Sequence, residues 1–176
     1  MKRSLLLRRL LLVAGALLVA SCAAYRGSEL KPGVATLPEV LATMGEPAMR
    51  WKDNDGREQL AYPRGPAGTQ TFMAWIAADG RLERIEPVLD AAHFARIETG
   101  KSDQAAVLRV LGPSPSQWTQ FYQRSNQLAW SWLFCDSWNS QAFFDVMFDA
   151  TTGIVLGTGQ RQNLMGWDGR APSCSH

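Results

Sequence analysis

The sequence predicts an α+β fold built from two tandem units, each a short helix or helix pair packed on a three-stranded antiparallel meander. The clearest observation is a repeat, because residues 59–62 read QLAY and residues 127–130, which begin 68 positions later, read QLAW. A glycine-bounded apolar segment precedes each tetrapeptide, and apolar runs separated by turn residues follow it. Such self-similarity indicates one structural unit that is present twice.

Each unit is expected to begin with a short amphipathic helix, in residues 33–47 and in residues 100–113. In both segments Val-Leu follows the first glycine by seven residues, and a second glycine follows it by twelve. Thr36 or Ser102 can accept hydrogen bonds from the free N–H groups of the first helical turn. The second glycine can adopt the left-handed conformation that ends a helix, and a proline close behind prevents its continuation.

Three strands are expected after each helix. Their ranges are 49–52, 59–62 and 71–77 in the first unit, and 117–122, 127–135 and 142–149 in the second. The turns between them contain residues suited to positive φ, such as Asn54-Asp55-Gly56. A further apolar run lies at 154–156. The apolar spacing over 87–97, with Asp90 as N-cap, predicts a helix that links the two units.

The first 21 residues predict a signal peptide. Four basic residues come before or at the edge of an apolar run at 10–20, which suits a secretory segment and is shorter than the roughly 20 residues that span a bilayer. The run ends in Val19-Ala20-Ser21-Cys22, which resembles the bacterial lipobox. The resemblance implies cleavage before Cys22, diacylglyceryl transfer to its thiol and acylation of the new N-terminus. The alternatives are an ordinary signal peptide cleaved near Ala23-Ala24, or an uncleaved anchor.

The chain is thus divided into five segments. They are a signal peptide (1–21), a tether (22–32), a first repeat (33–87), a second repeat (88–165) and a C-terminal tail (166–176). From Cys22 onward the chain has 14 basic and 16 acidic residues, a net charge of −2. A nucleic-acid partner is not expected, since it would need a clustered basic patch.

Besides Cys22, the chain contains Cys135 and Cys174. In an oxidising periplasm, two remaining cysteines favour a disulfide, which would tie the C-terminal tail to the rest of the chain. The alternative is a pair of free thiols, because sequence alone does not reveal the distance between them.

The order of the motifs resembles the SmpA/OmlA, or BamE-like, lipoprotein family. The resemblance rests on G-x6-VL-x3-G-x-P before a strand with Trp or Tyr, on the loop R-G-P-x-G-T that begins at Arg64, and on F-D-x-x-x-G-x-V from Phe148 to Val155. The second copy departs from the first motif, because Gly112 is followed directly by Pro113. It covers most of the chain after Cys22, in two copies, and implies a helix pair on a three-stranded sheet. It also implies a Gram-negative outer-membrane lipoprotein that faces the periplasm. Ala23, where an Asp would favour the inner membrane, agrees with this location.

No catalytic, cofactor-binding or metal site is expected. His93 lies in the predicted linking helix, with no nucleophile at a recognisable spacing. Cys174 and His176 are close in sequence, but they supply fewer than the three or four protein ligands of a zinc site. The loop from Arg64 to Thr71 lacks the Gly-Lys-Ser/Thr ending of a phosphate-binding loop. An enzyme would need an acid–base pair that the sequence does not display.

The remaining candidate site is an apolar surface. Alternation gives the strands at 71–77 and 142–149 two apolar faces each. Helices suit one face, whereas the other needs the sister sheet, a partner protein or water as its cover. The residues expected on a partner surface are Arg64, Met73, Trp75, Phe143 and Met147. The alternative for these residues is a core shared by the two units.

These features predict a non-catalytic, lipid-anchored periplasmic module that binds proteins and supports outer-membrane protein assembly or envelope integrity. The expected partners are envelope proteins, with the β-barrel assembly machinery implied by the family resemblance, and the membrane, which the acyl chains would enter. The two-copy plan is also similar to that of the β-lactamase-inhibitory proteins. The alternative function is therefore a tandem-repeat inhibitor of a periplasmic enzyme.

Overall fold

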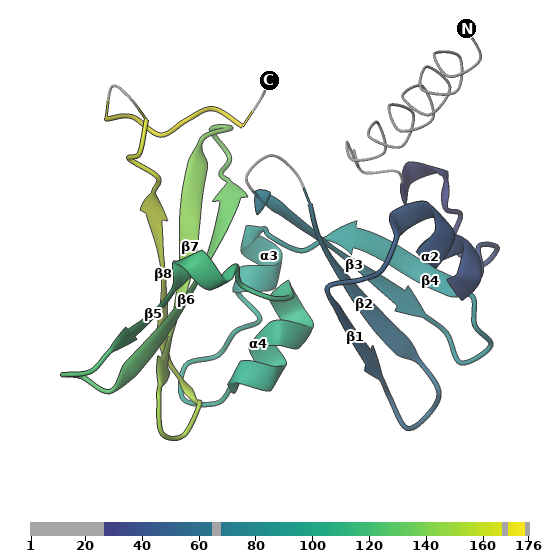
Figure 1. Cartoon of the computed structure of the whole chain (residues 1–176), viewed down its shortest axis with the longest axis horizontal. Coiled ribbons are helices and arrows are strands. Elements are labelled where there is room, and N and C mark those ends of the chain that lie inside the picture. Colours follow the sequence, from purple (N-terminus) through teal and green to yellow (C-terminus); the bar gives the residue numbers. More distant parts are fainter. Residues whose placement is uncertain (1–26, 65–67, 167–168, 175–176) are drawn as a thin grey trace, which may run out of the picture.

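The computed structural model describes residues 27–64, 68–166 and 169–174. Within these residues the fold has two four-stranded antiparallel sheets (Figure 1). The first sheet consists, in spatial order, of β1 (Met49–Lys52), β2 (Glu58–Arg64), β3 (Gln70–Ile76) and β4 (Leu82–Pro87). The second sheet consists of β5 (Thr119–Tyr122), β6 (Gln127–Cys135), β7 (Gln141–Asp149) and β8 (Val155–Gln162). The predicted signal peptide and Cys22 lie outside the described residues.

The helices are short. They are η1 (Gly27–Glu29), α2 (Leu37–Met44), α3 (Ala91–Phe94), α4 (Gln104–Leu111) and η3 (Ser116–Trp118). None of the helices in the described part of the chain has the length and apolar character needed to cross a membrane.

The expected α+β class, with two units of helix on three strands, is wrong because the fold is dominated by two sheets of four strands. The strands missing from the prediction are β4, which reads LERIEP, and β8, which reads VLGTGQRQ. Charged residues in β4 and glycines in β8 lower strand propensity. Each becomes a strand because it pairs antiparallel with the preceding strand of its sheet, β3 or β7. Both segments are edge strands, and backbone hydrogen bonds to the neighbouring strand, not their side-chain types, explain why they are extended.

The ends of α2 and α4 follow from local sequence, with one correction. At the start of α2, the Thr36 backbone N–H donates to Glu39 Oε2 at 2.7 Å. The N-cap of α4 is Asp103, whose carboxylate accepts from the Ala106 N–H at 2.7 Å, so the prediction of Ser102 as N-cap is wrong. Asp103 lies one residue nearer the helix and is an equally good cap. Both helices end at a glycine with φ near +75°, Gly45 and Gly112.

One face of each sheet carries its own helices and forms a core. Against α2, the first sheet buries an apolar cluster that includes Val40, Met44, Leu60, Tyr62, Phe72, Ala74, Ile76 and Leu82. Against α3 and α4, the second sheet buries a cluster that includes Phe94, Val107, Leu111, Trp132, Phe144, Val146, Phe148 and Val155. In this cluster Phe94 of α3 stacks on Phe144 of β7, with ring centroids 3.9 Å apart.

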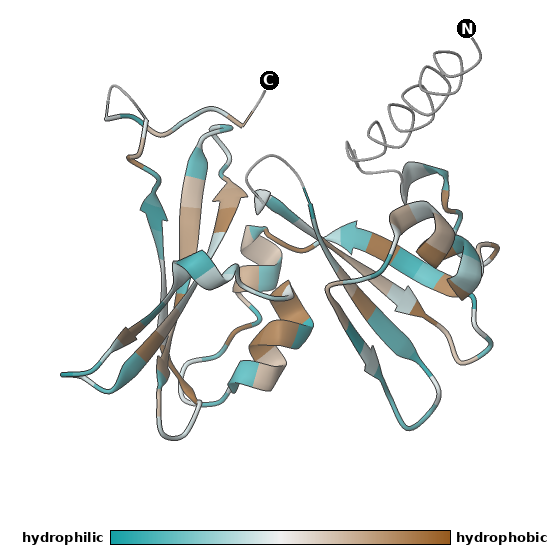
Figure 2. Cartoon of the chain, viewed as in Figure 1, coloured by the Kyte–Doolittle hydropathy of each residue, from teal (hydrophilic) through white to brown (hydrophobic). Residues whose placement is uncertain are grey.

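The other face of the first sheet is covered by α4, which therefore packs between the two sheets (Figures 1 and 2). Gln59 Nε2 of β2 donates to the Arg109 carbonyl oxygen of α4 at 2.6 Å. The Arg109 guanidinium donates to Gln59 Oε1 at 3.2 Å and to Asp53 Oδ1 at 2.5 Å. At the end of α4, a Cβ on Gly112 would lie 2.9 Å from Thr71 Cγ2, so the two halves meet in close contact.

The C-terminal segment is attached to the end of the second sheet. A disulfide joins Cys135 of β6 to Cys174, with the two Cα atoms 6.0 Å apart. Ser140 and Ser173 form a β-bridge, and the Cys174 N–H donates to the Asn139 carbonyl at 2.9 Å. The segment thus lies along the β6–β7 turn.

Candidate functional site: the open face of the second sheet

The second sheet has a face that no α-helix of the described residues covers. Its strands alternate, so the residues between those of the core point to this face. We call it the open face and define it by Trp118, Tyr122, Ser131, Asp145, Met147 and Arg161, which line a hollow of about 360 Å³. The short helix η3 forms one side of the hollow, because Trp118 is its last residue.

Two glycines of β8 lie beside the hollow. Gly157 pairs with Met147, and Gly159 pairs with Asp145. A Cβ on either glycine would have no neighbouring atom within 4 Å. Along β8, the open face therefore has no side chain at positions 157 and 159, and the next residue of β8 that faces this side is Arg161.

A paired charge lies at the centre of the open face. Asp145 accepts hydrogen bonds from Ser131 Oγ at 2.5 Å and from Arg161 Nε at 2.8 Å. The side chain of Asp145 is 23% exposed, and that of Arg161 is 54% exposed. An exposed guanidinium held by a partly buried carboxylate has a fixed direction, and fixed polar groups favour recognition of a specific partner.

The same arginine also packs on an aromatic ring, that of Phe143. The Arg161 guanidinium lies 4.1 Å from the centre of the Phe143 ring, and Trp118 contacts that ring edge-on at 5.0 Å. Phe143 is only 6% exposed as a result. Arginine, tryptophan and tyrosine are the residue types that contribute most to binding energy in protein interfaces.

This arrangement differs from that of a serine nucleophile. Ser131 Oγ donates to a carboxylate that is already paired with a guanidinium, whereas an activated serine donates to a free base, usually histidine. His93 is engaged elsewhere, since its Nδ1 lies 2.9 Å from Asp90 Oδ1 on α3. His176 lies outside the described residues. In the described part of the chain, no group of three or more His, Cys, Asp or Glu side chains could hold a metal ion.

The structure separates the five residues predicted for a partner surface. Phe143 and Met147 lie at the open face, although Phe143 is beneath Trp118 and Arg161. The other three lie on the first sheet, where Met73 has no exposed surface. The Arg84 guanidinium lies 3.7 Å from the ring centre of Trp75, and Arg64 donates to the Met44 carbonyl at 2.5 Å.

Sequence reasoning missed Trp118, Ser131 and Arg161 as members of the site. Alternation in 142–149 already places Asp145 on one face with Phe143 and Met147. A signal for Arg161 was missing because β8 was not predicted to be a strand. Without β8 there is no register that brings Arg161 opposite Phe143.

Burial is the main influence on the pKa of Tyr62, a residue of the first sheet. The hydroxyl of Tyr62 is fully buried and has no hydrogen-bond partner among the described residues. This burial raises the pKa of Tyr62 to about 12. Tyr62 therefore belongs to the core beneath α2 and not to the open face.

Comparison of the chain with protein-family models, with curated proteins and with solved structures finds no match. The resemblance to the BamE-like lipoproteins thus stays a prediction that rests on the motifs of the sequence.

Proposed function

We propose that this chain is a lipid-anchored, protein-binding module of the bacterial envelope, without catalytic chemistry, and that the open face of the second sheet binds its partner. Its location would be the periplasmic side of the outer membrane. Its partner would be an envelope protein, with the β-barrel assembly machinery as the first candidate because of the BamE-like motifs.

One observation carries the proposal. Both sheets contain the same alanine–methionine pair, Ala61 with Met73 in the first sheet and Ala129 with Met147 in the second. In the first sheet the C-terminal turn of α4 lies on this pair, since a Cβ on Gly112 would be 3.4 Å from Ala61 Cβ and 3.6 Å from Met73 Cε. In the second sheet the pair lines the open hollow.

The first sheet therefore provides an internal example of how such a face is covered. A helix ends on the methionine, and polar side chains beside it, Gln59 and Asp53, hold the helix backbone and its arginine. The open face offers a methionine, a paired Asp145–Arg161 and aromatic side chains around it. We expect the partner to place a helix end or a loop of similar size over Met147.

The partner can be identified by crosslinking and mass spectrometry. Cells would carry C-terminally tagged wild type, the open-face variant Met147→Arg, or the matched control Phe121→Arg. Phe121 is exposed and lies on the opposite face of the same sheet, where it pairs with Leu128. We expect Met147→Arg to reduce the recovered partner at least tenfold and Phe121→Arg to leave it unchanged.

The outcomes separate the alternatives. Recovery of β-barrel assembly subunits above an unrelated lipoprotein control would support the assembly role. Recovery of a single periplasmic enzyme, together with its inhibition by the purified chain, would favour the inhibitor. Equal recovery of the same partner by Met147→Arg and wild type would overturn the use of the open face.

The anchor is tested separately, by fractionation of a Cys22→Ala variant. We expect this variant to leave the outer-membrane fraction, either as soluble periplasmic protein or as retained precursor. If it fractionates like wild type and the wild-type protein carries no acyl chains by mass spectrometry, the lipid-anchor part of the proposal is wrong.

A further inference from the structure

Three large apolar side chains project into solvent at one end of the second sheet. Trp138 in the β6–β7 turn is 85% exposed, and Leu164 and Met165, which follow β8, are 64% and 86% exposed. We call these three residues the apolar tip. Most exposed apolar residues of a soluble protein are scattered singly, and a group at one end indicates a contact surface.

Side-chain hydrogen bonds connect the two segments that carry the tip residues. Asn163, just before Leu164, donates through Nδ2 to Gln141 Oε1 at 3.0 Å, and Gln162 Nε2 donates to Asp136 Oδ2 at 3.0 Å. Asp136 and Gln141 flank the turn that carries Trp138. The loop after β8 is therefore attached to the base of this turn.

The turn itself is held in place. Asp136 Oδ1 accepts from the backbone N–H groups of Trp138 and Ser140, each at 2.9 Å. The disulfide between Cys135 and Cys174 fastens the neighbouring C-terminal segment to the same end of the sheet. Trp138 is thus presented by an ordered turn, so its exposure does not result from a loose loop.

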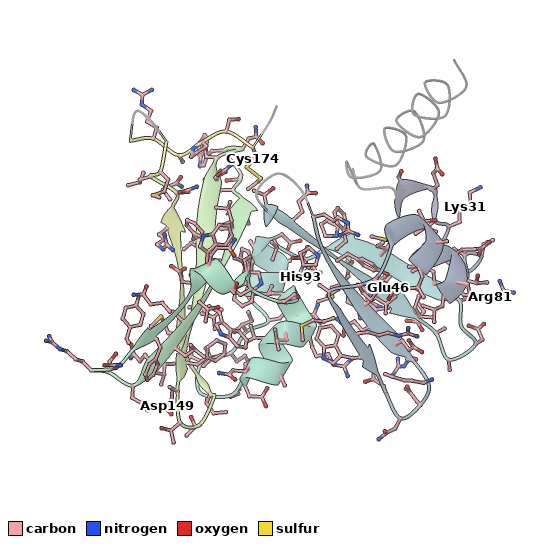
Figure 3. All side chains as sticks on the ribbon, in the orientation of Figure 1. Lys31, Glu46, Arg81, His93, Asp149 and Cys174 are labelled. Carbon is pink, nitrogen blue, oxygen red and sulfur yellow. A yellow bond between two sulfur atoms is a disulfide. The ribbon has the colours of Figure 1, made fainter. Side chains whose placement is uncertain are left out.

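The described chain begins on the same side of the molecule as the tip. Figure 3 shows Lys31 and Cys174 toward one side and Asp149 toward the opposite side. Cys22 precedes Gly27 by five residues, and an extended chain covers at most about 3.6 Å per residue. Acyl chains on Cys22 would therefore hold Gly27 within about 18 Å of the membrane surface.

We propose that the apolar tip inserts into the phospholipid surface that carries the anchor, as a second, non-covalent membrane contact. Tryptophan favours the interface between headgroups and acyl chains, and leucine and methionine side chains suit the apolar layer just below it. This inference rests on the proposed lipid anchor. Acyl chains alone leave the orientation of the domain undetermined, whereas a second contact point fixes it and directs the open face.

The test uses the full lipoprotein in phosphatidylethanolamine–phosphatidylglycerol vesicles. Wild-type thiols are either proposed to be acylated or joined in the disulfide, so a cysteine at Ser137 would be the only free thiol for an environment-sensitive fluorophore. The matched control places the same label at Ala150, an exposed residue next to Asp149 on the opposite side. We expect a blue shift of about 10 nm or more and quenching by spin-labelled lipid at position 137, and neither effect at position 150.

The tip residues are then replaced in the position-137 background. Trp138→Ala with Met165→Ala should lower the quenching at least twofold, whereas Phe121→Ala, another exposed apolar residue, should not change it. If, on vesicle-bound protein, the label at position 137 shows no more blue shift or quenching than the label at position 150, the proposed insertion of the tip is wrong. The proposed lipid anchor is not affected by that result. If Cys22 is not acylated, the chain from Ala23 can be held on nickel-chelating lipid by an N-terminal histidine tag. The same comparison of labels then tests the tip, because the fluorescence does not depend on acylation.

Discussion

The two sheets have the same strand order and the same alanine–methionine pair, yet the faces that carry this pair meet different environments. In the first sheet Met73 is completely buried beneath α4, which belongs to the second half of the chain. In the second sheet Met147 lines an open hollow. The comparison shows that α4 covers this face of the first sheet, whereas no helix of the described residues covers the matching face of the second.

The polar side chains near the alanine–methionine pair also differ between the covered face and the open face. On the first sheet Gln59 and Asp53 bind the helix that covers them. On the second sheet Ser131, Asp145 and Arg161 bind one another and leave the arginine half-exposed. The first face is completed by intramolecular contacts, whereas the second leaves an ordered polar centre partly exposed.

The largest predicted effect concerns the disulfide, which exists only in the second half. Cysteines 135 and 174 are 39 residues apart in sequence, so loop closure contributes about 4 kcal/mol to the free energy of unfolding. Cys135→Ser combined with Cys174→Ser should lower stability by about this amount in urea denaturation. The core beneath α2 should be least affected in hydrogen exchange. Equal loss of protection in both sheets would mean that the halves unfold as one unit.

The second largest predicted effect concerns the contact between the two halves of the chain, at Gly112 and Thr71. Gly112 has φ +75°, and its Cβ would lie 2.9 Å from Thr71, whereas Gly45 has φ +78° and open space around it. Alanine at position 45 carries only the backbone strain, about 1 kcal/mol or somewhat more, and alanine at position 112 adds a steric clash, for a total of about 3 kcal/mol. Urea midpoints of Gly45→Ala and Gly112→Ala would measure the difference. Equal midpoints would contradict the close contact.

A third prediction compares the two methionines directly. Met73→Ala should cost about 2–3 kcal/mol, since it leaves a cavity between β3 and α4. Met147→Ala, at the open hollow, should cost less than about 1 kcal/mol. Chemical denaturation of the two variants gives the free energies. A larger loss at Met147 than at Met73 would reverse the assignment of covered and open faces.

The smallest effect at neutral pH concerns the last position of the repeated tetrapeptide, Tyr62 in one copy and Trp130 in the other. Burial raises the pKa of Tyr62 to about 12, so the unfolded chain loses this proton at lower pH than the folded chain. The contribution of Tyr62 to the free energy of unfolding is complete below about pH 10 and is lost as the pH rises from about 10 to 12, with a total of roughly 3 kcal/mol.

Tyr62→Phe should remove that alkaline loss and change stability at pH 7 by less than about 1 kcal/mol. Stability measured from pH 8 to 12 for both proteins provides the test. An unchanged alkaline slope in Tyr62→Phe would show that another group is responsible. Trp130 cannot ionise in this range, so the second sheet supplies the internal reference.

Sequence reasoning succeeded where structure depends on neighbouring residues. The strand at 49–52 has the observed bounds, and alternation in 142–149 separates Phe144 from Phe143 as the structure does. The glycines at 45 and 112 end their helices with positive φ. Asp90 caps α3 as expected, with its carboxylate accepting from the His93 N–H at 2.9 Å. Each of these features follows from contacts within a few residues.

The missed fourth strands have a common physical cause. The strand β8 has two glycines and four polar residues among its eight, so its propensity gives little indication of a strand. It forms a strand because the edge of β7 offers backbone hydrogen-bond partners to it. Because β8 was not predicted, Arg161 could not be assigned to a face of the sheet, and it was therefore left out of the predicted site.

The sequence by itself determined the repeat, the glycines that end its two longer helices, the faces of its central strands and the motif at Cys22, because these depend on local spacing and residue type. It left open whether Cys135 and Cys174 pair and what covers the second face of each sheet. Only the tertiary structure decided that α4 serves both sheets and that the fourth strands complete them. The first outcome depends on which distant segments meet, and the second on backbone pairing with the preceding strand. The propensities of the single segments determine neither of them.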